Sequence, residues 1–342
     1  MKHLKEYWLL YLLLFIAAIM IIKGFLGAEH PTKKIVSSPE DTAEYWQAPS
    51  LFTDNELDGE ERELVIYGED LVANTSRYFG PKGIVKPINA GMNCQNCHLN
   101  AGKLPWGNNY GAVYSTYPKY RDRSGSVESI TKRVNDCFER SLNGETIDTN
   151  SHEMKAFLAY MKWIGQDVKK GEKPKGSGIN DLPYMDRAAS PEKGGIVYKN
   201  NCQTCHGTHG EGLKGPAGIS YTYPPLWGEN SFNIGAGLYR ISRLAGYARD
   251  NMPFGQSSHN NPKLTTEEAW DVAAFINSQP RPFMDLSKDW PDISKKPIDH
   301  PFGPFTDGFT EKQHKYGPFQ PIADARKKAK EAADKSRPPA KP

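Results

Sequence analysis

The chain has 342 residues, of which 38% are hydrophobic and 24% charged, with 31 glycines and 26 prolines. This length allows two ordinary domains, and the glycine and proline content predicts many loops and short helices. The formal net charge of +3 arises at the two ends, since residues 322–342 hold seven basic against three acidic side chains and residues 1–28 have a net charge of +2. The residues between these ends are slightly acidic, which argues against a nucleic-acid-binding protein.

The N-terminus is a basic segment followed by a hydrophobic run. Tyr7–Ile22 contains sixteen residues without a charge. This pattern is typical of an export signal, and the residues up to Ala28 extend it toward the length that crosses a bilayer. Because a small-x-small cleavage site is missing, we predict that residues 1–28 remain as an inner-membrane anchor, with a cleaved signal as the alternative. In both cases the body is expected to be periplasmic, with residues 29–58 as a linker or arm.

Residues 59–171 are predicted to form a first helical domain. A Cys-x-x-Cys-His motif lies within it at Cys94, Cys97 and His98. Apolar spacing and capping residues predict helices that begin near Glu60, Ser126 and Ser151 and end before Gly80, at Asn143-Gly144 and at Val168.

Residues 187–284 repeat this order after a charged, Gly- and Pro-rich linker at 172–186. The second motif is Cys202, Cys205 and His206, and helices are predicted at Pro191–Asn201, Phe232–Asp250 and Thr265–Ser278. The repetition indicates an internal duplication, and no strand-rich segment is evident, so we predict an all-α fold. The Pro- and aromatic-rich residues 285–321 are expected to pack on the outside of the body, and residues 322–342 to form a basic flexible tail.

Each Cys-x-x-Cys-His motif is the attachment signature of a c-type haem. The two thiols suit thioether bonds to the two vinyl groups, and the adjacent His98 or His206 suits an axial iron ligand. A zinc site built from the four cysteines is the alternative, but it leaves both histidines unexplained. We therefore predict two covalently bound haems c.

The second domain resembles a class I cytochrome c over its full length. The resemblance rests on the haem motif with the glycines after it, on Tyr223–Leu226, on Asn251-Met252-Pro253 and on the closing helix. It implies Met252 as the sixth ligand of the second haem. Met284 is the weaker candidate in this sequence. A thioether ligand opposite histidine raises the reduction potential.

Cys137 is the one cysteine outside the two motifs. Arg133 and Ser141 lie four residues before and after it, so a helix places the three side chains on one face. Taken alone, the pattern also fits an amphipathic helix with a buried thiol. Because the first domain lacks an equivalent of Met252, Cys137 is a candidate axial ligand of the first haem. Arg133, one turn away, would favour its thiolate.

Beyond a di-haem cytochrome, the chain resembles the thiosulfate dehydrogenase (tetrathionate-forming) family, relatives of which also run as tetrathionate reductases. The resemblance covers about residues 42–321 and is carried by Tyr67–Leu71, by Arg133–Gly144 and by the extension from Lys296 to Pro321. In some relatives a lysine just before the haem 2 methionine also serves as a ligand. Asn251 occupies that position here, so the sequence suggests stable ligation by His206 and Met252.

The resemblance implies an active-site haem ligated by His98 and Cys137, with the second haem as electron relay. It also implies an anion pocket formed by Arg123, Arg133 and Ser141. Arginine's planar fork suits sulfonate oxygens as it suits phosphate. Surface salt bridges are the alternative role of the two arginines.

We therefore expect a periplasmic oxidoreductase that interconverts two thiosulfate ions and tetrathionate plus two electrons. Cys137 is also a candidate nucleophile toward the sulfane sulfur. The expected electron partner is a small periplasmic cytochrome or a membrane quinol system. The alternatives are a di-haem electron carrier without its own substrate, and a sulfur-oxidation haem subunit that loads thiosulfate onto a carrier protein.

Overall fold

The structure is a computed structural model that describes residues 45–51, 57–216 and 218–336. The anchor predicted at residues 1–28 lies outside the described residues and stays a prediction. Within the described ranges, no helix is both long and apolar enough to cross a membrane.

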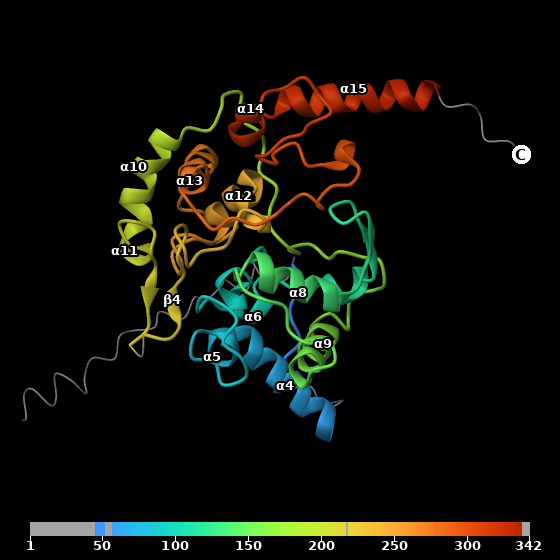
Figure 1. The fold of residues 1–342 in the computed structure, drawn as a ribbon, viewed down its shortest axis with the longest axis vertical. Helices are drawn as coiled ribbons and strands as arrows, with labels where there is room; N and C mark the ends of the chain where they lie inside the picture. Colours follow the sequence, from blue (N-terminus) through green and yellow to red (C-terminus); the bar gives the residue numbers. More distant parts are fainter. Residues whose placement is uncertain (1–44, 52–56, 217, 337–342) are drawn as a thin grey trace, which may run out of the picture. The chain divides into compact units, whose positions relative to one another are not determined.

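The first domain is built around its first and last helices, α4 and α9, which cross (Figure 1). Its elements are α4 (Gly59–Ala73), α5 (Thr75–Phe79), η1 (Cys94–Asn96), α6 (Leu99–Gly102), α7 (Val113–Thr116), β1 (Lys119–Arg121), β2 (Ser126–Glu128), α8 (Ile130–Arg140) and α9 (His152–Ile164). The buried faces of α4 and α9 supply Leu71, Phe157 and Tyr160 to one hydrophobic core. Gly68 permits the close crossing, since a Cβ there would lie 2.1 Å from the carbonyl oxygen of Ala156.

The second domain repeats this plan. Its elements are α10 (Pro191–Asn201), α11 (Gln203–His206), β3 (Leu213–Lys214), β4 (Tyr221–Tyr223), η2 (Gly237–Tyr239), α12 (Ile241–Asn251) and α13 (Thr266–Ser278). A glycine again sits where the first and last helices cross, because a Cβ on Gly194 would lie 1.8 Å from the carbonyl oxygen of Asp271. Thr265 and Glu268 form a capping box at the start of α13. The duplication predicted from the sequence is therefore present in the fold.

The prediction of a helical fold is confirmed in its main feature, but the mostly helical chain also contains two short antiparallel hairpins that were not predicted. In the first, Lys119 pairs with Glu128 and Arg121 pairs with Ser126. In the second, Leu213 pairs with Tyr223. Strands of two or three residues are too short to produce a readable alternating pattern.

Two predicted helix starts are also wrong. Helix α8 begins at Ile130, because the hydroxyl of Ser129 accepts the N-terminal hydrogen bond from Lys132 while Ser126 lies in β2. The helix expected from Phe232 begins only at Ile241. Phe232 instead enters a small buried cluster with Ala236 and Tyr239. In both places tertiary contacts override the local helical pattern.

The C-terminal residues pack on the second domain. Short elements η3 (Ile293–Lys295) and α14 (Glu311–Tyr316) precede a long helix, α15 (Gln320–Ser336). Phe319 and Ile322 are buried in the second core. The tail predicted to be flexible is therefore helical up to Ser336, because its Ala- and Lys-rich sequence favours helix and its first turns are held by Ile322 and by an ion pair between Arg326 and Asp307.

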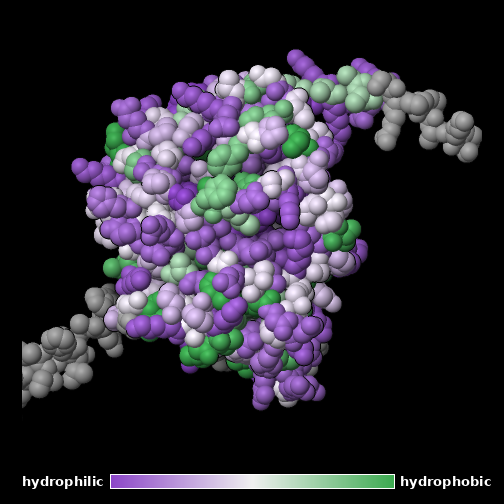
Figure 2. Space-filling view, viewed as in Figure 1, coloured by the Kyte–Doolittle hydropathy of each residue, from purple (hydrophilic) through white to green (hydrophobic). Residues whose placement is uncertain are grey.

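The surface has scattered apolar side chains. On the face shown in Figure 2, hydrophobic residues are interspersed among hydrophilic ones. Phe283 and Val127 are among the most exposed large hydrophobic residues of the described chain. Isolated residues of this kind are common on soluble surfaces and mark no site by themselves.

Candidate active site

The first haem motif is held by hydrogen bonds from α5 and its own turn. Cys94 donates its backbone N–H to the hydroxyl of Thr75 at 2.9 Å, and Asn93 accepts from the backbone of Ser76 at 2.8 Å. Cys94, Cys97, Cys137, Cys202 and Cys205 all carry free thiols, so no disulfide competes with thioether formation.

Both motif histidines are held by a backbone carbonyl oxygen at Nδ1. His98 Nδ1 lies 2.6 Å from the carbonyl oxygen of Asn108, and His206 Nδ1 lies 2.8 Å from that of Pro224. A carbonyl can only accept, so Nδ1 carries the proton and Nε2 keeps its lone pair. Burial lowers the pKa of His98 to about 4 and also lowers the pKa of His206, which keeps both imidazoles neutral.

A cavity of about 600 Å³ opens beside the first motif and fits a haem. Cys94, His98 and Cys137 line it together with apolar and aromatic side chains, including Tyr110, Phe138 and Phe157. Trp106 also lines it, and its indole Nε1 is buried without a hydrogen-bond partner. A haem bound in this cavity could accept a hydrogen bond from this indole N–H through one of its acidic side chains. The thiols, the imidazole and this unpartnered donor therefore fit such a group.

Helix α8 places Arg133 and Cys137 one turn apart, with Ser141 as its C-cap. All three line a smaller cavity of about 200 Å³, and Arg123 reaches the same cavity from the β1–β2 turn. The charge of a Cys137 thiolate raises the pKa of the Arg133 guanidinium more than any other neighbouring group does. The structure therefore brings together the four side chains that the sequence singled out.

Arg123 is held in place by the C-terminal residues and the second domain. Its Nη1 donates to the carbonyl oxygen of Gly235 at 2.8 Å, while its Nε is buried without a hydrogen-bond partner. The carboxylate of Asp289 lies 3.9 Å from that Nε, which is too far for a hydrogen bond, and accepts from both Nη atoms of Arg140, at 2.7 and 2.8 Å. Burial and the charge of Arg140 lower the pKa of Arg123 to about 10. The cavity thus contains a buried cation with unmet donor capacity.

Several residues of this cavity were not predicted from the sequence. Arg121, Arg240, Arg243 and Trp290 also line it. Arg121 stands two residues from Arg123 on one hairpin, and Arg240 and Arg243 come from the start of α12. The Arg-x-Arg spacing was visible in the sequence, but nothing local showed that α12 of the second domain forms a wall of the first domain's cavity.

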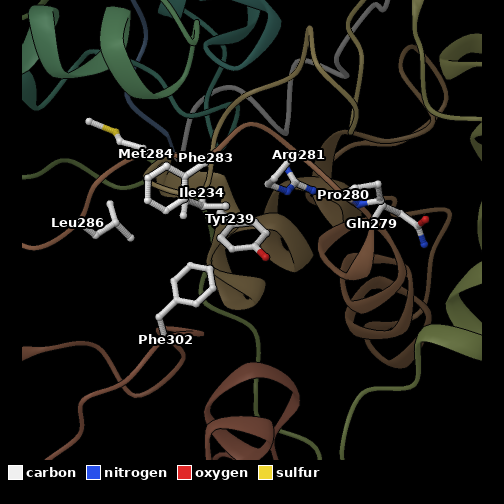
Figure 3. Close-up of a pocket in the computed structure, with 9 residues that line it drawn as sticks. All are labelled: Ile234, Tyr239, Gln279, Pro280, Arg281, Phe283, Met284, Leu286 and Phe302. Atoms are coloured by element: carbon white, nitrogen blue, oxygen red, sulfur yellow. The ribbon is translucent and has the colours of Figure 1, made fainter.

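In the second domain, Cys205 and His206 lie in α11 and Cys202 precedes it. Met252 directly follows α12 as its C-cap. The alternative ligand Met284 lies in a different, mostly apolar pocket of about 430 Å³, beside Ile234, Phe283 and Leu286 (Figure 3). None of Cys202, Cys205 and His206 lines that pocket, so Met252 stays the predicted sixth ligand of the second haem.

Helix α12 also connects the two haem domains. The Tyr247 hydroxyl donates to the backbone oxygen of Asn96, inside the first haem motif, at 3.0 Å. The amide of Asn251 donates to the backbone oxygen of Trp106 at 3.1 Å. Asn251, the residue directly before Met252, is therefore buried, and its side chain links the two domains by a hydrogen bond.

The structure does not support a zinc site built from the four motif cysteines. No group of three or more His, Cys, Asp or Glu side chains in the described part of the chain is placed to hold a metal ion. The two cysteine pairs therefore do not combine into one four-ligand site.

Comparison with protein families separates the same two domains. Residues 86–169 match the SoxA/TsdA cytochrome c domain, and residues 191–280 match the cytochrome c family. The two cytochrome c domains bind two covalently attached c-type haems.

Curated relatives carry the name thiosulfate dehydrogenase. A protein of Psychrobacter arcticus is 39% identical over 60% of this chain and 62% of its own length. One from Stutzerimonas stutzeri is 36% identical over 64% and 68%, and one from Allochromatium vinosum is 34% identical over 66% and 81%.

A solved structure gives the same result. The thiosulfate dehydrogenase (TsdBA) of Marichromatium purpuratum, in its "as isolated" form, superposes with a TM-score of 0.64 at 30% identity and covers 71% of this chain. The chain spans about half of that longer protein, 51%, and 62% of the Psychrobacter relative. The two haem domains, the cysteine on α8 and these relatives together establish that the chain belongs to the di-haem thiosulfate dehydrogenase family.

Proposed function

We propose that the protein interconverts thiosulfate and tetrathionate at the first haem. The observation that carries this proposal is the arginine-lined cavity beside Cys137. The names of the relatives supply the substrate class. In the oxidative direction two S₂O₃²⁻ ions become one S₄O₆²⁻ ion and release two electrons, so both atoms and charge balance.

Bringing two dianions together is the main electrostatic difficulty of this reaction. At a separation of about 5 Å and an effective dielectric constant of about 20, their repulsion is roughly 13 kcal/mol. One cation cannot offset that repulsion, whereas a group of fixed guanidiniums can. Arg123 and Arg133 are proposed to hold sulfonate oxygens, and Ser141 to donate its hydroxyl to the same anion.

His98 and Cys137 are proposed as the axial ligands of the first haem, and His206 with Met252 as those of the second. When bound, the two haems accept the two electrons. Cys137 is also proposed to bond transiently with the outer sulfur of one thiosulfate. Cys–S⁻ and S₂O₃²⁻ then give Cys–S–SSO₃⁻ with loss of two electrons, and attack by a second thiosulfate releases tetrathionate and restores the thiolate.

We further propose that the body is periplasmic and passes electrons to a small cytochrome or to a membrane quinol system. The basis is the basic, hydrophobic N-terminus together with haem attachment outside the cytoplasm. Protease accessibility in spheroplasts tests the location, since a periplasmic body is digested without lysis.

The deciding experiment uses the purified full-length holoprotein. Added thiosulfate should reduce the haems, and a chemical acceptor should then sustain formation of one tetrathionate per two electrons. Film electrochemistry with thiosulfate and with tetrathionate reports the preferred direction. A simple electron carrier would show neither response, and a subunit that loads thiosulfate onto a carrier would require that carrier protein.

Cys137→Ala tests the role of the thiol. We expect retention of both haems, a changed spectrum of the first haem and a loss of turnover of at least about 100-fold, on the order expected for removal of a nucleophile or ligand. Full turnover in Cys137→Ala or Cys137→Met would exclude both roles. Cys137→Ser, which keeps the size but not the thiolate, serves as the matched variant.

A further inference from the structure

We propose that Arg243 and Arg121 form a second anion subsite, which holds the second thiosulfate while Arg123, Arg133 and Ser141 hold the first. The inference rests on the proposed function, because only a reaction that joins two anions needs two subsites. It assigns a binding role to an arginine that α12 contributes from the second haem domain.

Arg243 and Arg121 lie where the two cavities adjoin. The cavity of about 600 Å³ that fits the haem and the arginine-lined cavity of about 200 Å³ share a small set of lining residues. Arg121, Arg133 and Arg243 are the cations of that shared set, and Cys137 belongs to it as well. An anion held there would approach the same thiol as one held by Arg123 and Ser141, which line the smaller cavity but not the larger one.

These two arginines keep donor capacity for a ligand. Arg121 Nε lies 3.8 Å from the Glu128 carboxylate, which is too long for a hydrogen bond. Arg243 pairs with Asp181 at 2.9 Å, but the Asp181 side chain is 78% exposed, and such pairs contribute little. Each guanidinium has five N–H donors, so most of them remain for a sulfonate.

The neighbouring Arg240 differs from Arg121 and Arg243, because its guanidinium is bound to a buried carboxylate. It donates from Nε and Nη2 to the buried carboxylate of Asp299, at 2.8 and 2.5 Å. Asp299 is 3% exposed and also accepts from Ser242. Arg240 is therefore engaged structurally, although it lines the same cavity.

Replacing Asp181 should change anion binding in the opposite direction from replacing Arg243. It lies in the segment between the domains, lines the larger cavity and is the carboxylate paired with Arg243. A bound sulfonate would compete with Asp181 for that guanidinium. Removing the carboxylate should therefore strengthen anion binding, while removing the guanidinium should weaken it.

The experiment measures initial rates of the full-length holoprotein against thiosulfate concentration, and against tetrathionate in the reverse direction. Arg243→Gln should raise KM for both substrates by about 10-fold or more, the loss expected for a charge-assisted contact. Arg243→Lys, which keeps the charge but not the fork, should lie between it and the wild type. Asp181→Asn should lower KM by about 2-fold, since an exposed competing pair is weak.

Arg77→Gln is the matched control, because Arg77 is 65% exposed and lies 3.9 Å from its carboxylate partner. If Arg243→Gln behaves like Arg77→Gln while the wild type turns over thiosulfate, the second subsite is excluded and the proposed function stands. If Asp181→Asn raises KM as Arg243→Gln does, the pair acts structurally and the subsite is also excluded. A wild type that does not oxidise thiosulfate refutes the proposed function itself.

Discussion

Replacing Arg123 with glutamine should weaken binding of the first thiosulfate without destabilising the protein. Burial and neighbouring cations lower the pKa of Arg123 from 12.5 to about 10. One pKa unit corresponds to about 1.4 kcal/mol, so the protonated form is disfavoured in the folded state by roughly 3 kcal/mol. The side chain is 15% exposed, so solvent screens little of this cost.

The substitution also removes favourable contacts. The hydrogen bond from Arg123 to Gly235 and the stacking of its guanidinium on Trp290, at 5.6 Å from the ring centroid, contribute about 1 kcal/mol each. The balance predicts that Arg123→Gln is about 1 kcal/mol more stable than the wild type. The folded-state pKa lies below the unfolded value, so the gain should be constant from pH 6 to pH 9 and should shrink above about pH 10.

The assay compares thermal melting and thiosulfate kinetics of the two holoproteins in chloride buffer without sulfur oxyanions. We expect an equal or higher melting temperature together with a KM for thiosulfate raised by at least about 10-fold. Added thiosulfate should stabilise the wild type more than the variant, because the anion relieves the repulsion among the arginines. A variant that melts well below the wild type would show that Arg123 is a structural cation, and the reasoning about unmet charge would be wrong.

Two further predictions concern the helix crossing and the pH dependence. Gly194→Ala should lower the free energy of unfolding by about 2 kcal/mol, because its Cβ would lie 1.8 Å from the carbonyl oxygen of Asp271. Gly195→Ala in the same helix is the control. Its Cβ would meet ordinary contacts from 3.4 Å, so this variant should be neutral or up to about 1 kcal/mol more stable. Denaturant melts that show equal effects would contradict the close crossing. Burial and neighbouring cations lower the pKa of Lys119, in the wall of the haem 1 cavity, to about 8, so that cavity loses a positive charge as the pH rises through 8. KM for thiosulfate should therefore increase between pH 7 and pH 9 in the wild type and stay flatter in Lys119→Arg, and parallel pH profiles would exclude the lysine as the source.

Much of the fold was predictable because its signals are local. The two Cys-x-x-Cys-His motifs mark the haems, and their repetition with similar flanking helices predicts the duplication seen in α4 with α9 and α10 with α13. Cys137 could be singled out because the other four cysteines belong to the two haem motifs. Its spacing from Arg133 and Ser141 then predicts a shared helix face, and α8 places these side chains in one cavity.

The rest of the site depends on contacts between residues far apart in the chain. Arg123 bonds to Gly235 across 112 positions, and Arg140 bonds to Asp289 across 149. No local pattern encodes such pairs, because side-chain spacing reports only which face of an element a residue occupies. The sequence by itself thus determined the haem motifs, the helical duplication and the importance of Cys137. Only the tertiary structure decided that the start of α12 and the C-terminal residues complete the first domain's cavity, since a cavity's charge is set by whatever packs around it.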